Sequence, residues 1–210
     1  MLWYEELYHL LRAEEVCDED VQAIFEMDRE HFHGQGFQSK WWTCVVNASR
    51  FNTRLRMEKI GLIRSICKVA PSMLPERWRR MNVRELQKLA RSGMSIGAHT
   101  MSHPVLAQCS EDEAYREVQE SKTELERVLG QTVWAFAYPF GNPETMGERE
   151  VKIAREAGFE CAFVNVRGGS LDPSQCFALA RTHVTADMSL AEFEAHLSGF
   201  HTRLQSAVRG

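Results

Sequence analysis

The sequence lacks three features that would place it in large classes of protein. No stretch approaches the roughly 18–20 uninterrupted apolar residues that span a bilayer, and the N-terminus carries acids where an export signal would carry Lys or Arg. The six cysteines include no C-x-x-C pair. Positive charge is not concentrated, since 25 Lys+Arg face 29 Asp+Glu for a net charge of -4. We therefore expect a soluble protein, cytoplasmic by default, with no membrane span and no nucleic-acid partner.

The length suits one ordinary domain with an appended helical arm, because 210 residues are too few for two catalytic domains. The pattern changes near residue 80. We expect a helical N-terminal segment over residues 1–80 and a βα region over residues 81–210. In the first part, apolar spacing predicts three helices, near residues 2–11, 21–32 and 54–69. The apolar run at residues 41–46 predicts a short strand.

The second part repeats a helix, a glycine and a short apolar run. Capping pairs, a Ser or Asn followed three residues later by Glu, mark three helix starts: Asn82 with Glu85, Ser110 with Glu113, and Ser189 with Glu192. The helices are expected over residues 83–92, 111–129, 147–157 and 189–204, and the strands over residues 94–98, 133–137, 161–164 and 177–184. This alternation is typical of an α/β fold with a parallel sheet or barrel.

Residues that follow such strands carry the chemistry in α/β folds. The first strand is followed by His99 and His103, whose spacing lets two imidazoles face one metal ion if the backbone turns between them. The second is followed by Tyr138, Pro139, Phe140 and Gly141. Aromatic rings there can wall a groove for sugars, and the glycine lets the backbone approach a ligand. Hydrogen-bonded surface histidines and a turn with two buried aromatics are the structural alternatives.

Together these two segments resemble the polysaccharide deacetylases, also called the NodB-homology or carbohydrate esterase family 4 enzymes. The stretch from His99 to Pro104 fits the family's H-[ST]-x-x-H-P metal motif, and Tyr138 to Gly141 fits its groove motif. The resemblance covers roughly residues 80–200. It implies a distorted (β/α) barrel and a metal-dependent hydrolase that removes acetyl groups from a polysaccharide.

The resemblance also implies roles for particular residues. His99 and His103 would bind zinc or a similar divalent ion, and Tyr138, Pro139, Phe140 and Gly141 would bind the saccharide. His183 is the best placed candidate for the family's general acid, against the alternative of a histidine with a structural hydrogen bond.

The resemblance fails at the family's Asp-Asp pair, which supplies a metal ligand and the catalytic base, because no such pair stands upstream of the histidines. We expect an incomplete barrel that begins after the family's first two strands, with activity of this chain lost if nothing replaces the pair.

Two other functions remain open at this stage. One is a non-catalytic remnant that binds glycan or protein through the groove. The other is a helical module that binds a partner through Trp3, Tyr4, Trp41 and Trp42. An incomplete sheet would also expose an edge, which favours homo-oligomers.

Overall fold

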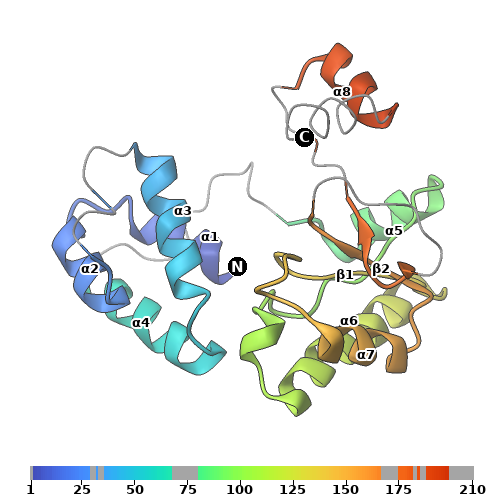
Figure 1. The fold of residues 1–210 in the computed structure, drawn as a ribbon, viewed down its shortest axis with the longest axis horizontal. Helices are drawn as coiled ribbons and strands as arrows, with labels where there is room; N and C mark the ends of the chain where they lie inside the picture. Colours follow the sequence, from blue (N-terminus) through green and yellow to red (C-terminus); the bar gives the residue numbers. More distant parts are fainter. Residues whose placement is uncertain are drawn as a thin grey trace, which may run out of the picture.

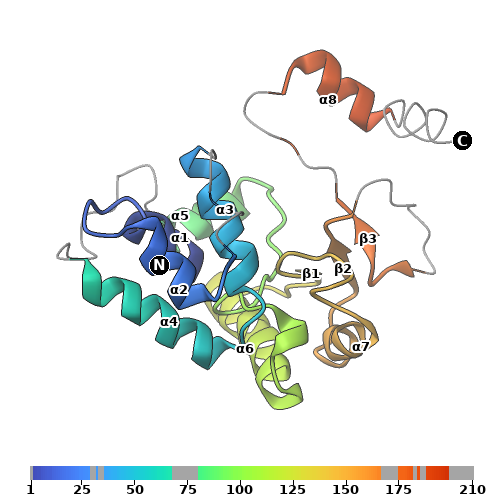
Figure 2. The ribbon, with the colours of Figure 1, turned by 60° about the vertical axis from the view of Figure 1, so that its left-hand side comes forward.

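The computed structural model describes residues 2–28, 32, 36–67, 80–166, 175–181, 184 and 188–198. Helices α1 to α4 gather on one side of the molecule, and a small sheet with helices α5 to α7 forms the other side (Figure 1). The last helix, α8 (Leu190–Leu197), lies away from both parts in the two views (Figure 2). None of the described helices has both the length and the apolar character that crossing a membrane requires.

The first part of the chain is helical, as predicted. Its helices are α1 (Trp3–Leu10), α2 (Asp18–Phe25), α3 (Phe37–Ala48) and α4 (Thr53–Ile66). They share one hydrophobic core, whose fully buried members include Leu7, Val21, Phe25, Val45, Ile60 and Ile63. Helix α2 stops earlier than expected because Glu26 adopts a left-handed conformation with φ 56°.

The predicted strand at residues 41–46 is wrong, because these residues lie inside helix α3. The buried residues of this helix are Cys44, Val45 and Ala48, which stand one and four positions apart and so share one helical face. A short apolar run fits a buried strand and a half-buried helix equally well. Packing of α3 against α1 and α2 favours the helix over the strand for residues 41–46.

The second part alternates helices and parallel strands. Its elements are α5 (Val83–Arg91), the 3-10 turn η3 (Leu106–Gln108), α6 (Glu111–Leu129), β1 (Ala135–Ala137), α7 (Glu148–Glu156), β2 (Cys161–Val164) and β3 (Leu179–Ala180). The strands are parallel in the order β1-β2-β3. The expected strand at residues 94–98 is reduced to a parallel bridge between Ala98 and Phe136.

The sheet therefore adds each strand beside the one before it in the chain, and α6 and α7 cover one face of the sheet (Figure 1). Sequential parallel order with helices on one face is the arrangement of an arc of a (β/α) barrel, whereas a doubly wound sheet reverses its order. The described residues form such an arc, and closure into a barrel stays a prediction.

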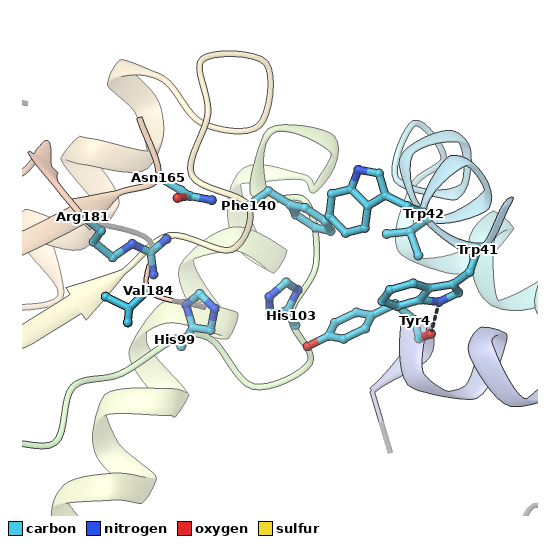
Figure 3. A pocket seen from close by; sticks show the side chains of 10 residues that line it. Tyr4, Trp41, Trp42, His99, His103, Phe140, Asn165, Arg181 and Val184 are labelled. Atoms are coloured by element: carbon cyan, nitrogen blue, oxygen red, sulfur yellow. Dashed lines mark hydrogen bonds between the residues drawn. The ribbon is translucent and has the colours of Figure 1, made fainter. Parts of the chain in front are cut away.

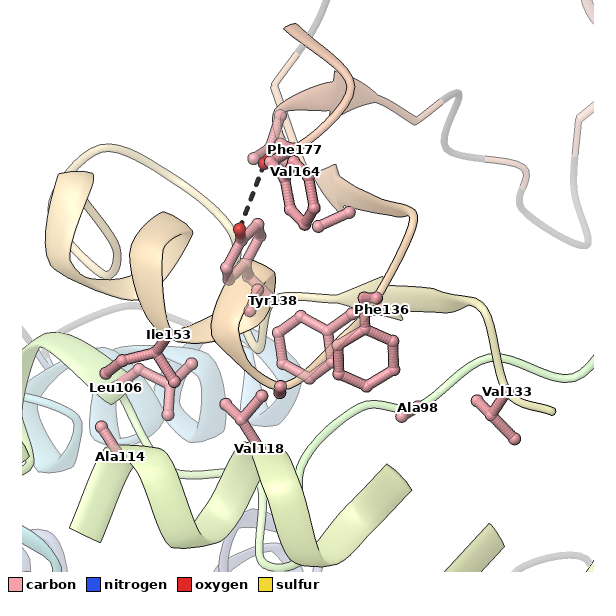
Figure 4. Close-up of a cluster of buried hydrophobic side chains, with 14 of the residues drawn as sticks. Ala98, Leu106, Ala114, Val118, Val133, Phe136, Tyr138, Ile153, Val164 and Phe177 are labelled. Carbon is pink, nitrogen blue, oxygen red and sulfur yellow. Dashed lines mark hydrogen bonds between the residues drawn. The ribbon is translucent and has the colours of Figure 1, made fainter. Parts of the chain in front are cut away.

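A second hydrophobic core lies between this sheet and its helices (Figure 4). Phe136 from β1 packs there with Val118 of α6 and Ile153 of α7, and all three are almost fully buried. Tyr138 is also fully buried, and its hydroxyl donates to the carbonyl oxygen of Phe177 at 3.1 Å. This core fixes the carboxyl end of β1, from which one of the predicted site segments leaves.

The division of the chain at residue 80 stays a prediction.

Candidate functional site

The two predicted metal-ligating histidines lie together at the carboxyl edge of the sheet. His99 follows the bridge residue Ala98, and its ring centroid lies 4.8 Å from that of His103. The Nδ1 atom of His99 is 2.6 Å from the carbonyl oxygen of Ala137. If Nδ1 donates this hydrogen bond, Nε2 carries the free lone pair that a metal ion needs, which is the usual arrangement of a ligating histidine.

A single carboxylate holds the loop between the histidines. Glu117 of α6 accepts hydrogen bonds from the backbone amides of Met101 and Ser102, at 2.8 and 2.9 Å, and from the Ser102 hydroxyl at 2.6 Å. The loop needs this support because Thr100 and His103 both adopt positive φ, at 64° and 57°, where side chains are strained. The loop thus turns sharply enough to bring the two imidazoles to one place.

Desolvation favours the neutral form of both histidines. It lowers the pKa of His103 to about 4, with a further contribution from the neighbouring His99. His99 is exposed towards solvent, yet desolvation by nearby atoms also lowers its pKa. The Nδ1 atom of His103 is buried and has no hydrogen-bond partner among the described residues. Both rings therefore offer lone pairs at neutral pH, which is the form in which imidazole binds metals.

The second predicted segment turns beside the pair. Phe140 and Gly141 adopt positive φ, at 59° and 68°. A Cβ atom on Gly141 would lie 2.8 Å from the backbone nitrogen of Asn165, so only glycine fits there without a shift. Phe140 lines the site, with its ring 5.1 Å from that of His103. The Tyr138 ring points instead into the core, and a role of Tyr138, Pro139 or Gly141 in binding substrate stays a prediction.

The histidines open into a pocket of about 420 Å³ (Figure 3). Its lining comes from both parts of the chain: Tyr4, Trp41, Trp42, Val45, His99, His103, Phe140, Asn165, Arg181 and Val184. The Tyr4 ring lies 5.0 Å from the His103 ring. The sequence shows the aromatic residues of the helical segment but not their place at the histidines, because no local pattern predicts a contact between residues about a hundred positions apart.

Helix α1 is hydrogen-bonded directly to the histidine loop. The indole nitrogen of Trp3 donates to the carbonyl oxygen of His103 at 3.1 Å. Behind this indole lies Arg56 of α4, which is 1% exposed and has its guanidinium 4.7 Å from the Trp3 ring centroid. Burial lowers the pKa of Arg56. The stacked cation helps to fix the indole, and the indole in turn fixes the backbone of His103.

The donor set suits a divalent ion that favours imidazole, such as zinc, but supplies two of the three protein ligands that a catalytic zinc usually has. Across the described ranges, no cluster of three His, Cys, Asp or Glu side chains could hold a metal. His183, the predicted general acid, lies outside the described residues.

Comparisons with known proteins agree with this geometry. The family model described as polysaccharide deacetylase matches residues 72–162, which contain both histidines and the Phe140 turn. Over this stretch the chain is similar to the polysaccharide deacetylases. A curated relative, YxkH of Bacillus subtilis, carries the name of a polysaccharide deacetylase and is 25% identical over 113 residues, covering 54% of this chain.

Two solved structures of deacetylases share the fold over about half of their length. The Streptococcus pyogenes deacetylase PplD in complex with acetate superposes with a TM-score of 0.52 at 24% identity, over 58% of this chain. A polysaccharide deacetylase from Bacillus cereus gives a TM-score of 0.50 at 17% identity, over 70% of this chain. The matches span 39% of YxkH, 52% of PplD and 49% of the Bacillus cereus chain, so this chain corresponds to about half or less of these relatives.

Proposed function

We propose that this chain is a polysaccharide deacetylase-like hydrolase that removes acetyl groups from a carbohydrate polymer with the help of a divalent metal ion, most simply zinc. The observation that carries the proposal is the meeting of His99 and His103, both on the stretch that the family model matches, in the lining of one pocket. Neutral imidazoles at a sheet's carboxyl edge, with one ring anchored to the Ala137 carbonyl, suit metal binding.

In this proposal each residue of the site has a separate task. His99 and His103 hold the ion, and Glu117 keeps their loop in its turned form. Phe140 packs against the apolar part of the substrate, while the turn at Gly141 brings backbone groups to the pocket edge. A bound divalent ion supplies polarisation of the acetyl carbonyl and a lowered pKa for attacking water. Proton donation by His183 remains part of the proposal.

The test is acetate release from acetylated oligosaccharides, measured with and without added zinc. We expect zinc to increase acetate release and a chelator to abolish it. His99→Ala should reduce acetate release to background. His196→Ala, which changes a histidine on α8, serves as the control and should keep full activity. A zinc-loaded chain that releases no acetate from any of several acetylated polymers would contradict the proposal.

A second candidate is a non-catalytic glycan-binding protein of the same fold. It is favoured by one observation, that no third metal-ligating side chain joins the histidine pair within the described ranges. It predicts saccharide binding that is indifferent to chelator, and no acetate release.

A further inference from the structure

We propose that Tyr4, Trp41 and Trp42 of the helical segment form a subsite that stacks a sugar ring beside the histidine pair. All three residues precede residue 72, where the match to the family model begins. The subsite would therefore lie outside the stretch that the family model matches. The inference rests on the proposed function for the class of ligand, an N-acetylated saccharide, but not for any step of hydrolysis.

The three aromatic residues form one wall of the pocket. The indole nitrogen of Trp41 donates to the carbonyl oxygen of Tyr4 at 2.9 Å, which joins α3 to α1. The rings of Trp41 and Trp42 lie 6.0 Å apart, and the Tyr4 ring touches His103. Figure 3 shows these rings on one side of the histidines, with Asn165 and Arg181 on the other side. The wall is therefore held in place by bonds within the protein.

Trp42 lies on the exposed side of α3, away from the buried residues of the helical core. The buried residues of α3 are Cys44, Val45 and Ala48, and Trp41 packs against the same core. Trp42 is 52% exposed. A single exposed hydrophobic residue needs no explanation, but this one shares a pocket with two other aromatic rings and with the histidines. Its exposed indole is available to a ligand at no cost to the fold.

The two sides of the pocket match the two surfaces of a pyranose. A sugar ring has an apolar C–H face, which packs on aromatic rings, and an edge of hydroxyl groups, which needs hydrogen-bond partners. The aromatic wall suits the face, and the Asn165 amide and Arg181 guanidinium suit the edge. None of the described residues that line the pocket is Asp or Glu. A cationic sugar would lack a counter-charge there, so a neutral acetylated sugar is favoured over its deacetylated amine product.

The test measures saccharide binding separately from catalysis. Isothermal titration calorimetry in the presence of EDTA would use three pentamers as probes. Two are acetylated, the β-1,4-linked and the β-1,6-linked pentamers of N-acetylglucosamine, and the third is the fully deacetylated chitosan pentamer. We expect one of the acetylated pentamers to bind the wild-type chain and the amine pentamer to bind more weakly. Trp42→Ala should weaken binding about tenfold, equivalent to about 1.4 kcal/mol.

Trp134→Ala is the matched control, since Trp134 is 39% exposed and precedes β1 at the opposite edge of the sheet. It should bind like the wild type, and equal melting temperatures of the two variants would show that folding is unchanged. Absence of binding by any acetylated pentamer, or equal affinity of Trp42→Ala and wild type, would overturn the subsite. Binding without acetate release would instead count against the proposed hydrolase and leave the subsite standing.

Discussion

Among single residues, Glu117 has the clearest task, because its carboxylate accepts three hydrogen bonds from the histidine loop. Glu117→Gln removes the negative charge that strengthens these bonds. We expect the free energy of unfolding to fall by about 1–3 kcal/mol, and zinc affinity to fall with it. Urea denaturation and zinc titration would measure both effects. Glu120→Gln, an exposed change on the same helix, is the control, and equal behaviour of the two variants would contradict the assignment.

Gly141 is the second residue whose identity the structure explains. Its φ is 68°, and a Cβ atom would lie 2.8 Å from the Asn165 nitrogen. Gly141→Ala should therefore lower the free energy of unfolding by about 1–3 kcal/mol. Gly61→Ala offers the matched comparison, because Gly61 lies inside α4 with nothing within 4 Å of its Cβ position. That change should stabilise the protein by about 0.5–1 kcal/mol. Thermal and urea unfolding that ranked the two variants in the reverse order would disprove this account.

At the scale of elements, Lys122 joins helix α6 to the starts of two strands. Its ammonium donates to the carbonyl oxygens of Val133 and Gly158, at 2.6 and 3.1 Å, and the residue is 8% exposed. Lys122→Met keeps most of the apolar stem but leaves both carbonyls without their donor. We expect a loss of about 2–3 kcal/mol in the free energy of unfolding by urea denaturation. Lys152→Met, on the exposed side of α7, should change stability little, and a similar loss there would refute the role of Lys122.

The helices of the second part could be predicted closely because their end signals are local. Helix α6 was expected over residues 111–129 and spans Glu111–Leu129, since Ser110 caps its start and Gly130, at φ 66°, ends it. Strands were harder to predict, because a strand exists only where a partner pairs with it. The run at residues 94–98 makes one bridge, and the run at residues 41–46 became part of a helix.

At the scale of the whole molecule, the pocket is assembled from segments that are distant in the sequence. The family motifs predicted that His99 and His103 would meet, because they stand four positions apart on one loop and the loop turns. Nothing local predicted that Trp3 would bond to the His103 carbonyl or that Tyr4 would lie against the His103 ring. Those contacts follow from how the helical core packs on the βα part, which is a property of the complete fold.

The central claim, that the histidine pair binds a metal ion, is tested most directly by zinc titration of the purified chain. Wild type, His196→Ala and the double variant His99→Ala/His103→Ala would be compared against a chromogenic chelator. We expect about one zinc ion per chain in the first two proteins, and loss of that binding in the double variant with its melting temperature otherwise preserved. Zinc binding that is absent from the wild type, or unchanged in the double variant, would contradict the claim.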